Sequence, residues 1–331
     1  MNKKNWQVLI LAGIVALFTF NSCKKSDDQD EVDSGPTEWN RGPGLTGDPR
    51  TGAASFQIEG AGYITTGLLK NNERATDTYS LNIESGQWEE VAEFIGDARH
   101  GAVGFAIGNN GFVGTGYNGE TSLNDFYKYN SANDSWEEIA QFPGEGRYDA
   151  VAFALDGYGY VGLGSTESGK QFNDFYKYDP SSNSWTKLST NFAFKKAGAF
   201  AFVIGDKAYI GGGVENNQYP EDFYEFNGED FKPIGDIRRT GSETFDVTRS
   251  GASVFTIGNY AYVVAGKKGS VLSNVWKFDP SKDTWTNEHQ SLLGSAREKA
   301  VSFSWDGKGY ITTGNNGSST FYDTWVFNPV R

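Results

Sequence analysis

The chain has 331 residues, of which 42 are glycine, and aromatic residues make up 15% of it. Its formal net charge of −13 argues against nucleic-acid binding, which normally leaves a basic footprint. A single cysteine, Cys23, excludes an internal disulfide, and only two histidines, His100 and His289, argue against a multi-histidine metal site. The composition therefore predicts a folded chain that holds no metal and no cofactor.

Residues 1–22 predict a secretory signal peptide. Lys3 and Lys4 precede an apolar run over 6–20, which is shorter than the roughly 20 residues of a membrane-spanning helix. Ser22 followed by Cys23 resembles a bacterial lipobox, although Phe20 and Asn21 depart from its usual residues. The resemblance implies that Cys23 is lipidated and anchors the protein to a membrane. The alternative is an ordinary signal peptide with an incidental cysteine.

Residues 23–35 predict a flexible tether. This segment contains five acidic residues and few apolar ones, so it cannot bury enough surface to fold. With the signal and the cysteine, it leads us to expect an exported bacterial lipoprotein of the outer membrane, either periplasmic or exposed at the cell surface.

Residues 36–331 contain six copies of one repeat. Each copy starts with a basic residue, an alanine three positions later and a phenylalanine after three more. The spacings between the copies are 49, 48, 49, 53 and 48 residues, and the basic residues are Arg50, Arg99, Arg147, Lys196, Arg249 and Arg297.

Every copy continues through an apolar strand that ends in glycine, an aromatic strand and, except in the last copy, an outer strand led by Trp or Phe. Four strands in about 48 residues predict one blade of an all-β propeller. The order of glycine, tyrosine and tryptophan resembles the kelch repeat. Gly-Thr-Gly or Thr-Thr-Gly in place of Gly-Gly departs from it, as does Phe231 in place of tryptophan.

The sixth copy lacks its tryptophan strand, whereas Trp39 stands alone before the first copy. Trp39 precedes Arg50 by 11 residues, the same interval that separates Trp88 from Arg99 and Trp136 from Arg147. We therefore expect the strand around Trp39 to complete the last blade and close the ring, which removes the exposed edges.

In the kelch fold, the loops before each first strand and after each second strand reach one face, here called the channel mouth. The resemblance therefore implies that the six basic residues ring this mouth. They are either an anion-binding funnel or a structural feature that every blade shares, and the sequence leaves both open.

The residues that follow each basic residue differ between blades. Among them, His100, Tyr148, Asp149 and Glu298 are the candidate ligand-binding residues that we expect at the mouth. A carboxylate such as Asp149 or Glu298 among cations would serve as an acid or base or as an ion-pair partner. The loops after the second strands add further polar candidates, namely Tyr117, Glu120, Glu167, Glu215 and Tyr219.

One loop is seven residues longer than its counterparts. It contains Arg238, Arg239 and Glu243, and we expect it on the mouth face, where insertions often mark the binding side. The alternative is a neutral loop expansion.

Three functions known for kelch-type propellers are compared with this sequence. Copper oxidases of the galactose-oxidase type need two histidines, two tyrosines and a crosslinked cysteine on the fold, which this sequence does not offer. N-acetylneuraminate mutarotases are also exported six-bladed kelch proteins, and the resemblance to them extends to the fold and the export alone. Such catalysis needs a carboxylate as acid or base and an arginine to hold the sugar acid, for which this sequence offers Glu243 or Glu298 with Arg238, Arg239 or Arg297. The leading expectation is a non-catalytic module that binds a glycan or an envelope protein through the mouth face.

Overall fold

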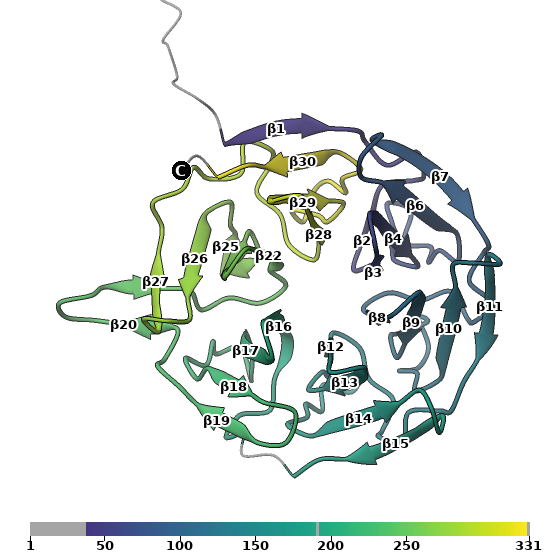
Figure 1. The fold of residues 1–331 in the computed structure, drawn as a ribbon, viewed down its shortest axis with the longest axis horizontal. Helices are drawn as coiled ribbons and strands as arrows, with labels where there is room; N and C mark the ends of the chain where they lie inside the picture. Colours follow the sequence, from purple (N-terminus) through teal and green to yellow (C-terminus); the bar gives the residue numbers. More distant parts are fainter. Residues whose placement is uncertain (1–37, 190–191, 330–331) are drawn as a thin grey trace, which may run out of the picture. The chain divides into compact units, whose positions relative to one another are not determined.

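The computed structural model describes residues 38–189 and 192–329. The predicted signal peptide, Cys23 and the tether to residue 35 lie outside the described residues. Six four-stranded antiparallel sheets form the blades of a propeller around a common axis (Figure 1). Within the described ranges, the structure contains no helix that is long and apolar enough to cross a membrane. The prediction of an all-β, six-bladed propeller is confirmed.

The blades follow one another along the chain, each from its inner to its outer strand. Blade 1 consists of β3 (Ala54–Ile58), β4 (Ala61–Thr65), β6 (Thr78–Asn82) and β7 (Gln87–Val91). Blade 2 consists of β8 (Val103–Ile107), β9 (Asn110–Gly114), β10 (Phe126–Asn130) and β11 (Ser135–Glu138). Blade 3 consists of β12 (Val151–Leu155), β13 (Tyr158–Gly162), β14 (Phe175–Asp179) and β15 (Ser184–Lys187).

The second half of the ring repeats this order. Blade 4 consists of β16 (Ala197–Ile204), β17 (Lys207–Val214), β18 (Tyr224–Phe226) and β19 (Phe231–Pro233). Blade 5 consists of β22 (Ser253–Ile257), β23 (Tyr260–Val264), β26 (Val275–Asp279) and β27 (Thr284–Thr286). Blade 6 consists of β28 (Val301–Trp305), β29 (Lys308–Thr312), β30 (Thr324–Phe327) and β1 (Trp39–Gly42).

Three short strand pairs lie outside the blades. They are β2 (Arg50–Thr51) with β5 (Leu68–Leu69), β20 (Arg238–Arg239) with β21 (Phe245–Asp246), and β24 (Lys267–Lys268) with β25 (Ser270–Val271).

Aromatic side chains fill the space between neighbouring blades. Phe56 of β3 stacks on Tyr63 of β4 with ring centroids 4.9 Å apart, and the same pair recurs in blades 2 to 5. The next blade meets this ring with a glycine. A Cβ on Gly111 would lie 2.2 Å from the Phe56 ring, so a larger residue would push the two blades apart. This contact explains the glycine that precedes the aromatic residue in the second strand of four blades, whereas blades 4 and 5 have alanine there.

Trp39 closes the ring, as the sequence predicts. Strand β1 pairs with β30 from Trp39 opposite Phe327 to Gly42 opposite Thr324. Trp39 is only 1% exposed, and its Nε1 donates a hydrogen bond to the backbone oxygen of Gln290 in the preceding blade at 3.0 Å. Other outer-strand tryptophans, such as Trp88 and Trp136, likewise donate to a backbone oxygen just after the preceding blade's outer strand. Trp39 is therefore the outer tryptophan of blade 6.

The extra loop between blades 4 and 5 points away from the channel axis, although its Asp246 pairs with Lys268 of the mouth-face strand β24 at 2.5 Å. Its hairpin β20–β21 projects outward from the ring (Figure 1). Phe245 anchors it in the core cluster that contains Trp276 and Trp285. The hairpin therefore extends the outer edge of blade 5, where β27 has only three residues.

The three candidate residues of this loop have partners there. Arg238 pairs with Glu221 at 2.8 Å, Arg239 pairs with Asp283 at 3.1 Å, and Glu243 accepts a hydrogen bond from Thr284 at 3.1 Å. The loop thus satisfies its own charges at the periphery, away from Glu298.

Candidate functional site

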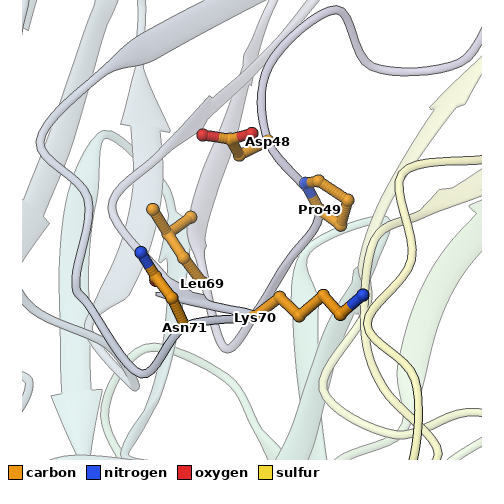
Figure 2. A pocket seen from close by; sticks show the side chains of 5 residues that line it. All are labelled: Asp48, Pro49, Leu69, Lys70 and Asn71. Atoms are coloured by element: carbon orange, nitrogen blue, oxygen red, sulfur yellow. The ribbon is translucent and has the colours of Figure 1, made fainter.

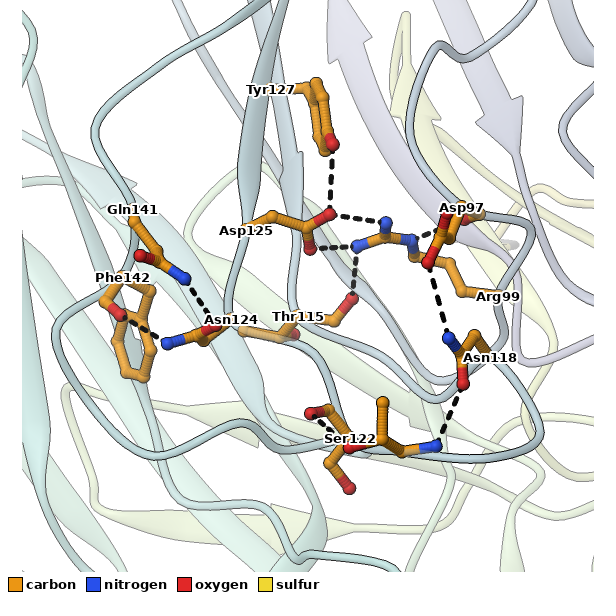
Figure 3. Close-up of polar contacts among 11 residues, drawn as sticks. Asp97, Arg99, Thr115, Asn118, Ser122, Asn124, Asp125, Tyr127, Gln141 and Phe142 are labelled. Atoms are coloured by element: carbon orange, nitrogen blue, oxygen red, sulfur yellow. Dashed lines mark hydrogen bonds and ion pairs between the residues drawn. The ribbon is translucent and has the colours of Figure 1, made fainter.

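The six repeated cations lie beneath the surface of the mouth. Arg249 is 1% exposed and the other five are fully buried. Figure 3 shows the arrangement in blade 2. The Arg99 guanidinium donates to both carboxylate oxygens of Asp125, to the backbone oxygen of Thr115 at 3.0 Å and to that of Asp97 at 2.7 Å. One side chain thereby ties together three segments of its blade.

The same set of bonds recurs in blades 1, 3 and 6, and it is thinner in blades 4 and 5. Lys196 reaches the carboxylate of Asp222 at 2.6 Å. Arg249 meets Asn274 where the other blades have an aspartate, and burial lowers its pKa to about 10. Because these cations are enclosed and bonded within their blades, the structure assigns them the structural role. This corrects their placement in the ligand-binding set.

The residues two positions after these cations form a closed ring of hydrogen bonds. Each backbone N–H donates to the backbone oxygen of the equivalent residue in the preceding blade, at 2.7–3.0 Å. All six residues have a positive φ, which favours glycine. They are Gly52, Gly101, Asp149, Gly198, Gly251 and Lys299. The ring uses these N–H groups internally, so they do not form an anion site.

Asp149 and Lys299 are the two exceptions to glycine in this ring, and they belong to opposite blades. The Nζ of Lys299 lies 2.5 Å from the Asp149 carboxylate, so their ion pair spans the mouth. Burial acts to lower the pKa of Lys299, but the carboxylates of Asp149 and Glu298 raise it on balance. The ammonium is therefore charged at neutral pH. Beneath the pair, the six inner strands line a channel cavity of about 330 Å³.

Above the ring, each blade contributes two residues joined by a backbone bridge. In blade 2 these are His100 and Tyr117, and in blade 3 they are Tyr148 and Ser165. The three aromatic rings form one cluster, with centroids 5.7 Å apart for His100–Tyr117, 5.6 Å for Tyr117–Tyr148 and 6.2 Å for His100–Tyr148. Two of the predicted mouth residues, His100 and Tyr148, are thus brought together, with Tyr117 between them.

Arg74 completes this cluster from the loop that connects β4 and β6 of blade 1. Its guanidinium lies over the Tyr117 ring at 5.2 Å, and its Nε donates to Nδ1 of His100 at 3.2 Å. Within residues 38–189 and 192–329, its Nη1 and Nη2 have no hydrogen-bond partner and no carboxylate partner. Unlike the repeated arginines, Arg74 is only partly buried. It is therefore a cation that an incoming anion can reach.

His100 is neutral at physiological pH. Burial and the charges of Lys299 and Arg74 outweigh the opposing effect of Asp149 and lower its pKa to about 4. Because Nδ1 accepts the bond from Arg74, the ring proton resides on Nε2. His100 thus presents a neutral hydrogen-bond donor beside Arg74.

Glu298 lies at the mouth in blade 6, as predicted, and its side chain is 14% exposed. Lys267 of blade 5 is 3.4 Å away, and Glu298 is bridged through its backbone to Asn315. Of the five residues considered for sugar chemistry, Glu298 alone occupies the mouth. Arg297 is buried against Asp323, which excludes it from contact with a ligand.

A cleft of about 420 Å³ lies between two mouth-face loops of blade 1, apart from the aromatic cluster. Figure 2 shows Asp48 and Pro49 on one of its segments and Leu69, Lys70 and Asn71 on the other. It has no aromatic ring, and Lys70 and Asn71 are exposed. The mouth cluster is the better-formed site. In the part of the chain that the structure describes, no group of three or more His, Cys, Asp or Glu residues is placed to hold a metal ion.

Comparisons with known proteins agree with this architecture. Residues 98–235 match the family model described as N-acetylneuraminate epimerase, and residues 248–288 match the Kelch motif. A solved structure titled "Structure of YjhT" aligns with a TM-score of 0.71 at 21% identity, over 86% of this chain and 95% of that one. A search of curated proteins finds no significant match. The chain is a six-bladed kelch-type β-propeller, and the epimerase match covers less than half of it.

Arg74 and Lys299 are the site residues that sequence reasoning missed. Arg74 lies in a loop that differs between blades, so no repeated pattern marks it. Lys299 could have been recognised from the sequence as a departure from the repeat, because four of the six equivalent positions are glycine. A lysine and an aspartate at left-handed positions indicate a local cost that another interaction offsets.

Proposed function

We propose that the protein binds a sugar acid of the N-acetylneuraminate class at the channel mouth and accelerates the exchange of its anomers. The observation that carries this proposal is Arg74, a half-buried guanidinium in an aromatic cluster whose terminal nitrogens are free among the described residues. The epimerase family match supports the sugar class, because residues 98–235 include His100, Tyr117, Tyr148 and Asp149.

The cluster offers a way to recognise both ends of such a ligand. A guanidinium fork binds a carboxylate through two parallel hydrogen bonds, which gives orientation as well as affinity. The rings of Tyr117 and Tyr148 provide apolar surface for the sugar, and Nε2–H of His100 adds a neutral donor. The sugar ring would then extend from Arg74 over the Asp149–Lys299 pair.

Anomer exchange needs one proton acceptor and one proton donor. The anomeric hydroxyl loses its proton, the bond between the anomeric carbon and the ring oxygen breaks, and the ring oxygen takes up a proton. The open chain then closes on the other face by the reverse steps. Glu298 is the proposed acceptor and the Lys299 ammonium the proposed donor, since the two are neighbours in sequence and interact electrostatically. The reaction requires no oxidant or metal.

Binding without turnover is the second candidate. Both mouth carboxylates have cationic partners, with Asp149 held by Lys299 and Glu298 next to Lys267. These ion pairs occupy the carboxylate oxygens that a general base would need to offer to the sugar. This arrangement favours a site that recognises the sugar acid and leaves its anomers unchanged.

Ligand-observed NMR separates the two candidates. Purified protein at a small fraction of the N-acetylneuraminate concentration should transfer saturation to the sugar and speed the exchange between its two anomeric signals. Saturation transfer without faster exchange supports the binding module. Absence of both contradicts the proposal. Glu298→Gln should lower exchange and retain saturation transfer, whereas Arg74→Ala should remove both.

We further propose that the protein is exported from the cytoplasm and is anchored to a membrane through a lipid on Cys23. The support is the lipobox-like sequence that ends in the only cysteine of the chain. Cys23→Ser should move the protein from the membrane fraction to the soluble fraction. Retention of the variant in membranes would contradict lipid anchoring.

A further inference from the structure

The face opposite the mouth carries one departure from the repeat that the proposed function does not use. Each inner strand ends there, and in five blades its last residue is Ile or Leu. In blade 6 this residue is Trp305, which is 40% exposed. Since the other five blades have an aliphatic residue here, Trp305 does not serve a packing role common to all six blades.

Trp305 borders a cavity of about 580 Å³ between blades 6 and 1. Ile83, Tyr310, Glu84, Asp306 and Lys308 complete its lining. The indole is held in place at its edge, since a Cβ added to Gly60 would lie 3.2 Å from its Cζ2 atom. Its exposed surface is therefore a positioned platform rather than a free side chain.

The polar groups around this platform are open to a ligand. Among the residues that the structure describes, the side chains of Glu84, Asp306 and Lys308 have no hydrogen-bond or ion-pair partner. Glu84 and Asp306 are exposed and Lys308 is half-buried. Two carboxylates and one ammonium thus surround an aromatic platform with their bonding capacity unused.

A second cavity of about 770 Å³ lies on the other side of the same turn. Gly307 lines it together with Tyr260, Lys277, Glu288 and other residues of blade 5. Tyr260 is 36% exposed, and the Nζ of Lys277 covers one side of its ring at 4.3 Å. Each side of the blade 6 turn therefore has one exposed aromatic ring beside acidic groups.

We infer that these two cavities form a groove that binds a neutral oligosaccharide across the blade 6 turn. The apolar face of a pyranose packs on an aromatic ring, and its hydroxyls donate hydrogen bonds to carboxylates. The carboxylates of Glu84, Asp306 and Glu288 outnumber the ammonium groups of Lys277 and Lys308, so the groove disfavours the anionic sugars that the mouth would select. This inference does not depend on the function proposed for the mouth.

Saturation-transfer NMR with three neutral hexasaccharides tests the groove: cellohexaose, maltohexaose and chitohexaose. At least one should receive saturation from the protein, and Trp305→Ala should weaken its binding at least tenfold. Gly60→Ala should weaken it less, because the added methyl group displaces the indole without removing it. Excess N-acetylneuraminate should not compete, and Arg74→Ala should leave the binding unchanged.

Leu293→Ala is the matched control, since Leu293 is another exposed apolar residue at 58% exposure. It should bind the hexasaccharide as the wild type does, and the melting temperatures of all variants should agree. No saturation transfer to any of the three sugars would overturn the inference. Unchanged affinity in Trp305→Ala would also overturn it.

Discussion

Arg99 and Arg74 belong to the same side of the propeller and have opposite surroundings. Arg99 is fully buried and saturated by a carboxylate and two backbone oxygens. Arg74 is half-buried, stacks on Tyr117 and leaves its terminal nitrogens free among the described residues. The first occupies a position that recurs in every blade, whereas the second occurs once. In this molecule a side chain repeated in every blade has a structural role, whereas the unrepeated Arg74 in a variable loop is the candidate ligand-binding residue.

Removal of a repeated arginine should produce one of the largest losses of stability. Arg99→Ala leaves the Asp125 carboxylate without its partner, and breaking such a buried pair costs about 3–5 kcal/mol. Urea unfolding measures the change. A loss below about 1 kcal/mol, the typical effect of a single mutation, would contradict the structural role.

Trp39 is the outer tryptophan of blade 6, although it is supplied by the N-terminal strand β1. Its substitution tests whether it stabilises its blade as the other outer tryptophans do. Trp39→Ala should destabilise the protein by about 3–5 kcal/mol, because it removes a fully buried indole from the closing strand. Trp305→Ala is the control, since that tryptophan is exposed. A melting temperature for Trp39→Ala equal to that of the wild type would contradict the closure by β1.

Blade 5 offers a substitution that should increase stability. Asn274→Asp restores the carboxylate that Arg249 lacks and should stabilise the protein by about 1–2 kcal/mol. The change should also raise the pKa of Arg249, which burial now lowers. Asp125→Asn in blade 2 is the reciprocal variant and should destabilise. Equal effects of the two substitutions would show that the carboxylate is not the stabilising element.

His100 gives the mouth a pH dependence that the buried cations do not have. Its folded-state pKa of about 4 lies below the unfolded value of 6.5, so between these values the unfolded chain binds more protons. Stability should therefore fall as the pH drops from about 6.5 to about 4, by at most about 1.4 kcal/mol per pH unit. His100→Gln should remove this slope. An unchanged slope in the variant would contradict a buried neutral histidine.

Arg74→Ala should have the smallest effect on stability, within about 0.5 kcal/mol. The Arg74 side chain is partly exposed and pairs with no carboxylate among the described residues. Thermal unfolding provides the measurement. A large loss of stability would place Arg74 with the structural arginines and weaken its assignment to a ligand.

The fold could be predicted because each of its determinants is repeated. Six equivalent basic residues gave the number of blades, and the constant interval from Trp39 to Arg50 gave the closing strand. What the repeat could not show was whether these cations face solvent. Their burial depends on partners such as Asp125, which lie 26 or 27 residues away and come together only when the blade folds.

The candidate site could be predicted only in part. His100, Tyr148, Asp149 and Glu298 lie at the mouth because they follow the repeated cations in register. Arg74 has no such register, and the hairpin with Glu243 is fixed by Phe245, which enters the core between blades 4 and 5. Loop direction depends on such tertiary packing, which loop length alone does not encode.

The most direct test of the account compares anomer exchange of N-acetylneuraminate in the presence of wild-type protein, Arg74→Ala and Arg238→Ala. Exchange NMR yields the rate for each protein under identical conditions. We expect acceleration by the wild type and by Arg238→Ala, and none by Arg74→Ala, although all three proteins should melt at similar temperatures. Equal acceleration by Arg74→Ala and the wild type would contradict the assignment of the mouth cluster as the sugar-acid site.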